Sequence, residues 1–309
     1  MTLRPFLIPT VCAVAALMSA CDGDNSVRIS SSRSENPDAK GVLKVVDALQ
    51  CPQTMGSLTR KGSAQANGTV CTYVGPKGSE VSLHLVALDN ETPAEALKAF
   101  EARLSADLPA AVAQLKASTE AETARIEAAD AASAAADAAS ADADRAAARA
   151  DGAAASADRA AAGADHASVR GPGVAIDANG DDATVSLPGM RIETKGDQAS
   201  VRIGGFHIDA NDSTGSARIR GTGGNGESVS INAQDDAAEV RTSAGGEATR
   251  TSWILTDNRD SPSGWRLVGY EARGPIGGPL VVATVRSRDA NRGRAFEDAR
   301  ELVTLNVGE

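Results

Sequence analysis

The chain has 309 residues, a formal net charge of −10 and only 3% aromatic residues. This length allows two or three small domains, and the scarcity of aromatic residues argues against one large aromatic core. The acidic balance disfavours nucleic acid as a partner, because the net negative charge of the chain repels phosphates. The three histidines, His84, His166 and His207, are far apart in sequence. We therefore predict neither a metal site nor a cofactor.

The amino terminus has the layout of a secretory signal peptide. Residues 1–20 read MTLRPFLIPTVCAVAALMSA, with Arg4 in a short positive region, an apolar stretch at 6–18 and two small residues at the end. This order is typical of a cleaved export signal. The apolar stretch is shorter than the roughly 20 residues of a membrane-spanning helix. We expect residues 1–20 to be removed on export.

The sequence LMSAC at 17–21 resembles the lipobox of bacterial lipoproteins. The resemblance implies that the chain is cut before Cys21 and that the Cys21 thiol carries lipid. Asp22 follows directly, and in the enteric sorting rule an aspartate at this position retains a lipoprotein in the inner membrane. We predict a lipid anchor on the periplasmic face of that membrane, with residues 21–40 as a flexible tether. The alternative is an ordinary cleaved signal in which Cys21 is incidental.

Two further cysteines belong to the exported body. Cys12 is removed with the leader and Cys21 takes lipid, which leaves Cys51 and Cys71 in an oxidising compartment. We expect these two to form a disulfide. The alternative is a pair of buried free thiols.

Residues 41–111 are predicted to form a small α+β domain around this disulfide. Residues 69–74 and 80–88 alternate as strands on either side of a Gly-Pro turn. Thr92, Pro93 and Glu95 are typical of a helix start, because Thr and Glu at this spacing form a capping box.

The next segment, predicted as 112–168, carries a seven-residue repeat. Aspartate recurs at every seventh position from Asp130 to Asp165, flanked by alanines at the a and d spacing of a heptad. Because alanine is the best helix former, this pattern predicts a long Ala-rich helix. Three alternatives stay open: a lone solvated helix acting as a spacer, a coiled coil that makes a homo-oligomer through the heptads, and disorder.

Residues 169–249 repeat with a period of 16, and each unit contains two short alternating strands. Units of equal length favour either a β-solenoid or an antiparallel meander. The pattern looks like the short β-helical regions of some bacterial envelope and adhesin-like proteins.

Charges separate the two arrangements of this β-repeat region. A solenoid would stack Asp177, Glu193 and Asp209, and like-charge neighbours cost energy. A meander would pair Glu193 with Arg202 and Asp209 with Arg218 across hairpins. Both arrangements stay open at this point.

Residues 250–309 are predicted to form a carboxyl-terminal α+β piece. Strands are expected at 251–255, 265–272 and 280–286, followed by a helix at 289–305. The predicted fold class of the whole chain is therefore α+β: a disulfide-bonded unit, a long helix, a β-repeat and this piece.

Two sequence motifs match ligand-binding patterns, but the residues around them do not fit the corresponding sites. Residues 221–226 match GxGxxG, but a strand pattern follows where a dinucleotide site needs a helix. Asp177, Asn179 and Asp181 have the spacing of a calcium loop start, without its later Gly and Glu. A loop insertion between repeats explains the first motif, and turn-forming residues explain the second.

The sequence therefore favours a non-enzymatic envelope lipoprotein that binds or scaffolds an envelope protein partner. One alternative is an enzyme or small-ligand carrier, with Tyr270, Glu271 and Arg273 near His84 in a cleft between the two α+β pieces. Another is a structural periplasmic spacer.

Overall fold

The structure is a computed structural model that describes residues 43–125, 127–128, 131 and 166–308, apart from 172–173, 225, 245, 247 and 290–292. In this part of the chain, sixteen strands form one sheet in the order β1-β2-β3-β4-β16-β15 and then down to β5. Every recorded pairing is antiparallel.

The first strands are β1 (Thr54–Met55), β2 (Leu58–Arg60), β3 (Val70–Val74) and β4 (Glu80–Val86). The repeat region supplies β5 (His166–Gly171), β6 (Val174–Asn179), β7 (Asp182–Leu187), β8 (Met190–Lys195), β9 (Gln198–Ile203), β10 (Phe206–Asn211), β11 (Ser216–Thr222), β12 (Ser228–Gln234) and β13 (Ala237–Ser243). The last strands are β14 (Thr249–Asp257), β15 (Leu267–Gly274) and β16 (Leu280–Ser287). The helices are α1 (Pro93–Ser105), one at 109–125 and α3 (Gly293–Val307), with 3-10 turns η1 (Ala66–Gly68) and η2 (Pro76–Gly78).

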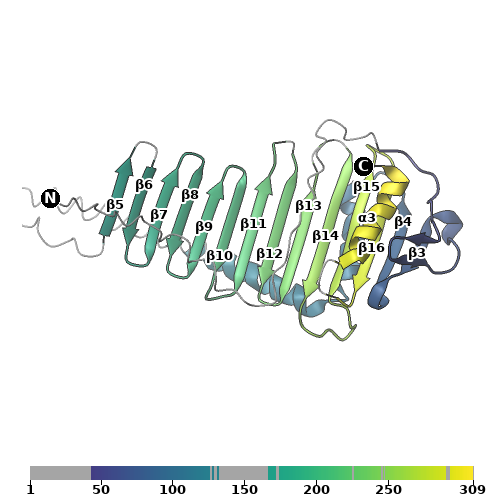
Figure 1. Ribbon diagram of the computed structural model, residues 1–309, viewed down its shortest axis with the longest axis horizontal. Coiled ribbons are helices and arrows are strands. Elements are labelled where there is room, and N and C mark those ends of the chain that lie inside the picture. Colours follow the sequence, from purple (N-terminus) through teal and green to yellow (C-terminus); the bar gives the residue numbers. More distant parts are fainter. Residues whose placement is uncertain are drawn as a thin grey trace, which may run out of the picture. The chain divides into compact units, whose positions relative to one another are not determined.

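Helices cover both faces of the sheet at the end where β4 and β14–β16 lie (Figure 1). Helix α3 packs on one face, against β16, β15 and β4, whereas α1 packs on the other, against β15 and β14. All eight residues of β15 are buried, as expected for a strand with a layer on each side. The α3-side core includes Leu58, Cys71, Tyr73, Val81, Leu83, Val285, Phe296, Ala299 and Leu302. The α1-side core includes Leu97, Phe100, Leu104, Leu108, Leu115, Leu255, Tyr270 and Val282.

Helix α1 begins with the predicted capping box. The Thr92 hydroxyl accepts from the Glu95 amide at 3.3 Å, and the Thr92 amide donates to the Glu95 carboxylate at 2.9 Å. These two bonds satisfy backbone groups that a helix start leaves unpaired.

The predicted disulfide is confirmed. Cys51 and Cys71 are bonded, with their Cα atoms 6.3 Å apart. Cys71 is buried within β3, so the bond ties the segment before β1 to the α3-side core.

The predicted fold class, with its α+β pieces and long Ala-rich helix, is wrong. Strand β4 pairs with β16, so the strands at the two ends of the chain belong to one antiparallel sheet. No local sequence pattern in these strands identifies the partner strand, so the sequence does not indicate this long-range pairing. At the end of the predicted helix, residues 166–168 form part of β5 instead, because β6 supplies their hydrogen-bond partners. The described helix at 109–125 precedes the Asp heptads, and residues 132–165 lie outside the described residues.

The β-repeats form a meander, so the solenoid alternative is wrong. Each 16-residue unit makes an antiparallel hairpin, which avoids stacking one unit's acid on the next. Asp209 lies opposite Arg218, as expected for a meander. Glu193 instead lies opposite Ser200, and Arg202 lies opposite Arg191, because the turn shifts the pairing by two residues from the predicted register.

Candidate functional site

The meander β5–β13 has two chemically different faces, because successive side chains of a strand point to opposite sides. We call the side that carries Arg241 and meets α1 the charged face, and the opposite side the apolar face. On the charged face, most strands carry acidic or basic side chains, and both kinds occur. Arg191 lies 3.4 Å from Glu193, and His207 lies 3.0 Å from Asp209. Such exposed pairs of both signs are typical of a solvated surface.

The apolar face consists of three rows that run across the strands, two of them from β6 to β13 and the third from β7 to β13. The middle row contains Ile176, Val185, Ile192, Val201, Ile208, Ile219, Ile231 and Val240. The small row contains Ala178, Ala183, Thr194, Ala199, Ala210, Ala217, Ala233 and Ala238. The large row contains Leu187, Met190, Ile203, Phe206, Gly221, Val229 and Thr242.

Two large side chains of the apolar face are exposed. Ile203 is 48% exposed and its cross-strand partner Phe206 is 49% exposed. The Phe206 ring leans over Gly221, where a Cβ would come within 2.4 Å of the ring. Among the described residues, no helix lies over this face between β6 and β12 (Figure 1).

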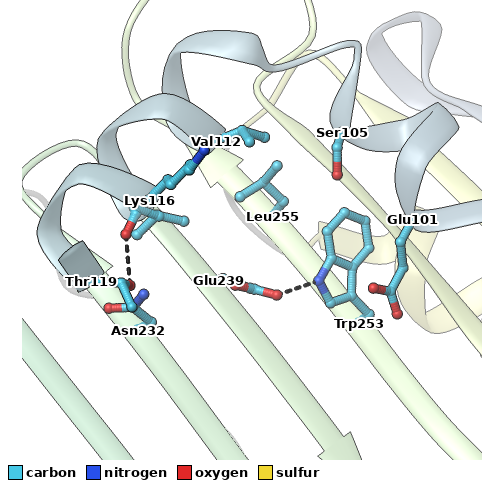
Figure 2. Close-up of a pocket in the computed structure, with 10 residues that line it drawn as sticks. Glu101, Ser105, Val112, Lys116, Thr119, Asn232, Glu239, Trp253 and Leu255 are labelled. Carbon is cyan, nitrogen blue, oxygen red and sulfur yellow. Dashed lines mark hydrogen bonds between the residues drawn. The ribbon is translucent and has the colours of Figure 1, made fainter. Parts of the chain in front are cut away.

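A groove of about 340 Å³ lies on the other side of the sheet, beneath the helix at 109–125 (Figure 2). Helix residues Val112, Lys116 and Thr119 form one wall, and Trp253 and Leu255 lie on the sheet. An adjoining hollow of about 170 Å³ is lined by Arg218, Arg220, Ser230, Asn232, Glu239 and Arg241, among others.

A hydrogen-bonded network closes the α1 end of this groove. The Glu101 carboxylate accepts two bonds from Arg241, at 2.6 and 2.9 Å, and one from the Tyr270 hydroxyl at 2.7 Å. The Trp253 indole donates to Glu239 at 2.7 Å, as Figure 2 shows, and stacks on Tyr270 with ring centroids 5.9 Å apart. The network links α1 to β13, β14 and β15.

The network holds its groups in their ordinary protonation states. Burial alone would raise the pKa of Glu101, but hydrogen bonds from Arg241 and Tyr270 outweigh burial and lower it. Burial, and then the bond to Glu101, raise the pKa of Tyr270. At neutral pH the carboxyl is therefore ionised and the phenol protonated. Neither is poised for acid–base catalysis near neutral pH, where such a group needs its pKa. Arg241, which lines the hollow, is paired with Glu101 and Glu239. A small anion bound in the hollow would therefore face the positive charges of Arg218 and Arg220.

The residues predicted for an enzyme site do not converge. Tyr270 and His84 lie on the α1 face, whereas Glu271 and Arg273 lie beneath α3 and pair with each other at 3.2 Å. Burial first, and then the charges of nearby arginines, lower the pKa of His84 to about 4. The proposed cleft between two α+β pieces is replaced by a continuous sheet.

Other predicted site residues cannot be placed. Cys21 and Asp22 lie outside the described residues. Within the described ranges, no group of His, Cys, Asp and Glu is arranged to hold a metal. The same ranges contain no helix that is long and apolar enough to span a membrane.

Sequence reasoning missed the two features that dominate this region. The Glu101–Arg241 pair joins residues 140 positions apart, and no local pattern marks it. The continuous apolar face could have been found from the 16-residue repeat once the hairpin register was known. No family model, curated protein or solved structure matches the chain.

Proposed function

We propose that this chain is a non-enzymatic, lipid-anchored envelope protein that serves as a binding or scaffolding module. The observation that carries the proposal is the apolar face of the meander, over which none of the described helices lies between β6 and β12. Soluble monomers rarely expose a contiguous apolar surface of more than a few hundred Å², and larger patches mark interaction sites. The module binds a protein partner through this face.

The anchoring half of the proposal rests on the amino terminus. The lipobox-like LMSAC ends at Cys21, and the polar segment that follows is long enough to hold the sheet away from the membrane. Asp22 favours the periplasmic face of the inner membrane. A polybasic patch for electrostatic membrane binding is absent from this acidic chain, which leaves lipid on Cys21 as the attachment.

Mass spectrometry of the membrane-fraction protein tests the anchor. The wild type should begin at a lipid-modified Cys21, and Cys21→Ala should lose both the lipid mass and membrane retention. Cys12→Ala is the matched control, because that cysteine is removed with the leader. An amino terminus that is uncleaved or unlipidated in the wild type would overturn the anchor.

Site-specific photocrosslinking in the producing cells tests the binding module. A p-benzoylphenylalanine replaces Ile203 on the apolar face of the full chain, and in a control chain it replaces the neighbouring Arg202 on the charged face. Irradiation should give a protein adduct from position 203 and little from position 202. Absence of any protein adduct at 203 would contradict the binding function.

A further inference from the structure

We propose that the groove beneath the helix at 109–125 and the hollow beside it bind one amphipathic phosphate, a small molecule that carries a phosphate group on an apolar chain. The phosphate lies in the hollow, against Arg218 and Arg220, and the apolar chain lies in the groove, against Trp253 and Leu255. This site is on the charged face of the sheet. It therefore goes beyond the proposed function, which concerns the opposite face, and does not rest on it.

The two arginines that face the hollow have no acidic partner among the described residues. Arg218 and Arg220 are two positions apart in β11, so their side chains leave the same side of the sheet and their charges repel each other. Asp209, which lies opposite Arg218, contacts His207 at 3.0 Å instead. A phosphate between the two guanidinium groups supplies the missing negative charge, and arginine binds phosphate in a two-pronged geometry.

The carboxylate that lines the hollow is already neutralised. Glu239 accepts hydrogen bonds from the Arg241 guanidinium at 3.2 Å and from the Trp253 indole at 2.7 Å. Between the arginines of β11 and β13, strand β12 contributes only the short side chains of Ser230 and Asn232 to this part of the hollow. These two side chains leave space for a ligand and offer a hydroxyl and an amide as further hydrogen-bond donors to it.

The sizes and linings of the two spaces suit the two parts of such a ligand. A phosphate group has five non-hydrogen atoms, and one water molecule takes about 30 Å³ of liquid water, so a hollow of about 170 Å³ accommodates the group. The groove of about 340 Å³ has apolar side chains at Val112, Trp253 and Leu255 (Figure 2). Because Thr119 and Asn232 line both spaces, one molecule can occupy both. An apolar lining with a few placed polar groups is typical of small-molecule sites.

An NMR titration of the tryptophan indole N–H signals tests the site. The protein is the mature chain, residues 21–309, with Cys21→Ala so that neither lipid nor detergent competes for the groove. The probes are inorganic phosphate, hexyl phosphate and hexanol. Trp253 lines the groove, whereas Trp265, the other tryptophan, lies beneath Arg288 and lines neither space.

Only hexyl phosphate fills both spaces, so it should bind with a dissociation constant more than about tenfold below those of the other two probes. Its binding should shift the Trp253 signal and leave the Trp265 signal in place. The Trp265 signal also reports that each variant is folded.

Variants of the hollow and of the groove separate the two halves of the site. Arg218→Gln with Arg220→Gln should weaken hexyl phosphate binding more than about tenfold, because both charges that face the phosphate are lost. Arg202→Gln is the matched control: Arg202 is on the same face but does not line the hollow, so the affinity should not change. Val112→Gln should remove the advantage of hexyl phosphate over inorganic phosphate. Val112 is 38% exposed, so this substitution leaves the core intact.

The results that would overturn the inference are distinct. Equal affinities for hexyl phosphate and hexanol, or for the double arginine variant and Arg202→Gln, would show that no phosphate is bound in the hollow. Equal affinities for hexyl phosphate and inorganic phosphate would show that the ligand has no apolar part, and would overturn the amphipathic class. A Trp253 signal that hexyl phosphate does not shift would overturn the whole site.

Discussion

The network around Glu101 gives the sharpest prediction about stability. Glu101→Gln keeps the size of the side chain but removes its charge and turns an amide NH₂ toward Arg241, which has only donors to offer. The change breaks the two-pronged contact at 2.6 and 2.9 Å and leaves a single acceptor for both Arg241 and Tyr270. Helix α1 should therefore be held less firmly on the sheet.

The expected loss of unfolding free energy depends on how exposed the side chains of the network are. The Glu101 side chain is 20% exposed, but that of Arg241 is 41% exposed, so water recovers part of the lost interaction. Tyr270 is fully buried and cannot find water in place of the carboxylate. We expect Glu101→Gln to lower the free energy of unfolding by about 2 kcal/mol. Tyr270→Phe, which removes only the hydroxyl, should lower it by about 1 kcal/mol.

Urea unfolding followed by tryptophan fluorescence measures both changes, because Trp253 lies in the network. The sign of the pH effect is fixed by the lowered pKa of Glu101. The carboxylate stabilises the fold fully above its ordinary pKa of 4.5, and this contribution disappears as pH falls through the lowered value in the folded state. The difference between wild type and Glu101→Gln should shrink there. A loss below about 0.3 kcal/mol at pH 7, or no coupling with Tyr270→Phe in a double-mutant cycle, would refute this account.

Three further predictions concern other parts of the fold. The pKa of His84 is lowered to about 4, so between pH 6.5 and about 4 the unfolded chain binds a proton at His84 that the folded chain does not, and the free energy of unfolding should fall across this range. His84→Gln should remove this pH dependence. A variant whose urea midpoint varies with pH as in the wild type would argue against it. The double variant Cys51→Ser/Cys71→Ser should lose about 3 kcal/mol of unfolding free energy, and the wild type in reductant should lose the same amount. Equal urea midpoints for the double variant and the oxidised wild type would mean that the bond does not restrain the unfolded chain. Gly56→Ala should lower the free energy of unfolding by about 2 kcal/mol or more, because Gly56 has φ +54° and a Cβ there would lie 2.1 Å from Asp298. Gly180→Ala is the control: Gly180 has φ +58° but open space around it, so the loss should be clearly smaller in the same assay.

Much of the local structure could be predicted from the sequence. The strands expected at 69–74 and 80–88 correspond to β3 and β4, and the capping box at Thr92 starts α1. The strands and helix expected after residue 250 correspond to β14, β15, β16 and α3. These elements depend on alternation, turns and caps, which act between near neighbours in the chain.

The arrangement of those elements could not be predicted in the same way. Strand β16 is largely apolar on both sides and β4 alternates like several other strands, so each could pair with several others, and nothing local selects their partner. The register of the repeat hairpins also depends on turn geometry, and a shift of two residues separates Glu193 from Arg202. The apolar face could not be predicted for the same reason, because it forms only when every hairpin has the correct register.

The pairing of β4 with β16 has a consequence for the order of folding. Ser82 and Thr284 lie 202 positions apart, yet they are neighbours across these two strands. A chain that emerges from the ribosome amino terminus first exposes the free edge of β4 until β16, the last strand, has appeared. High contact order makes such closure slow, and an unpaired strand edge is prone to aggregation meanwhile. Chaperones that act on this protein as it folds should therefore be needed longest for its first hairpin, and a chain truncated before β16 should accumulate as an aggregate.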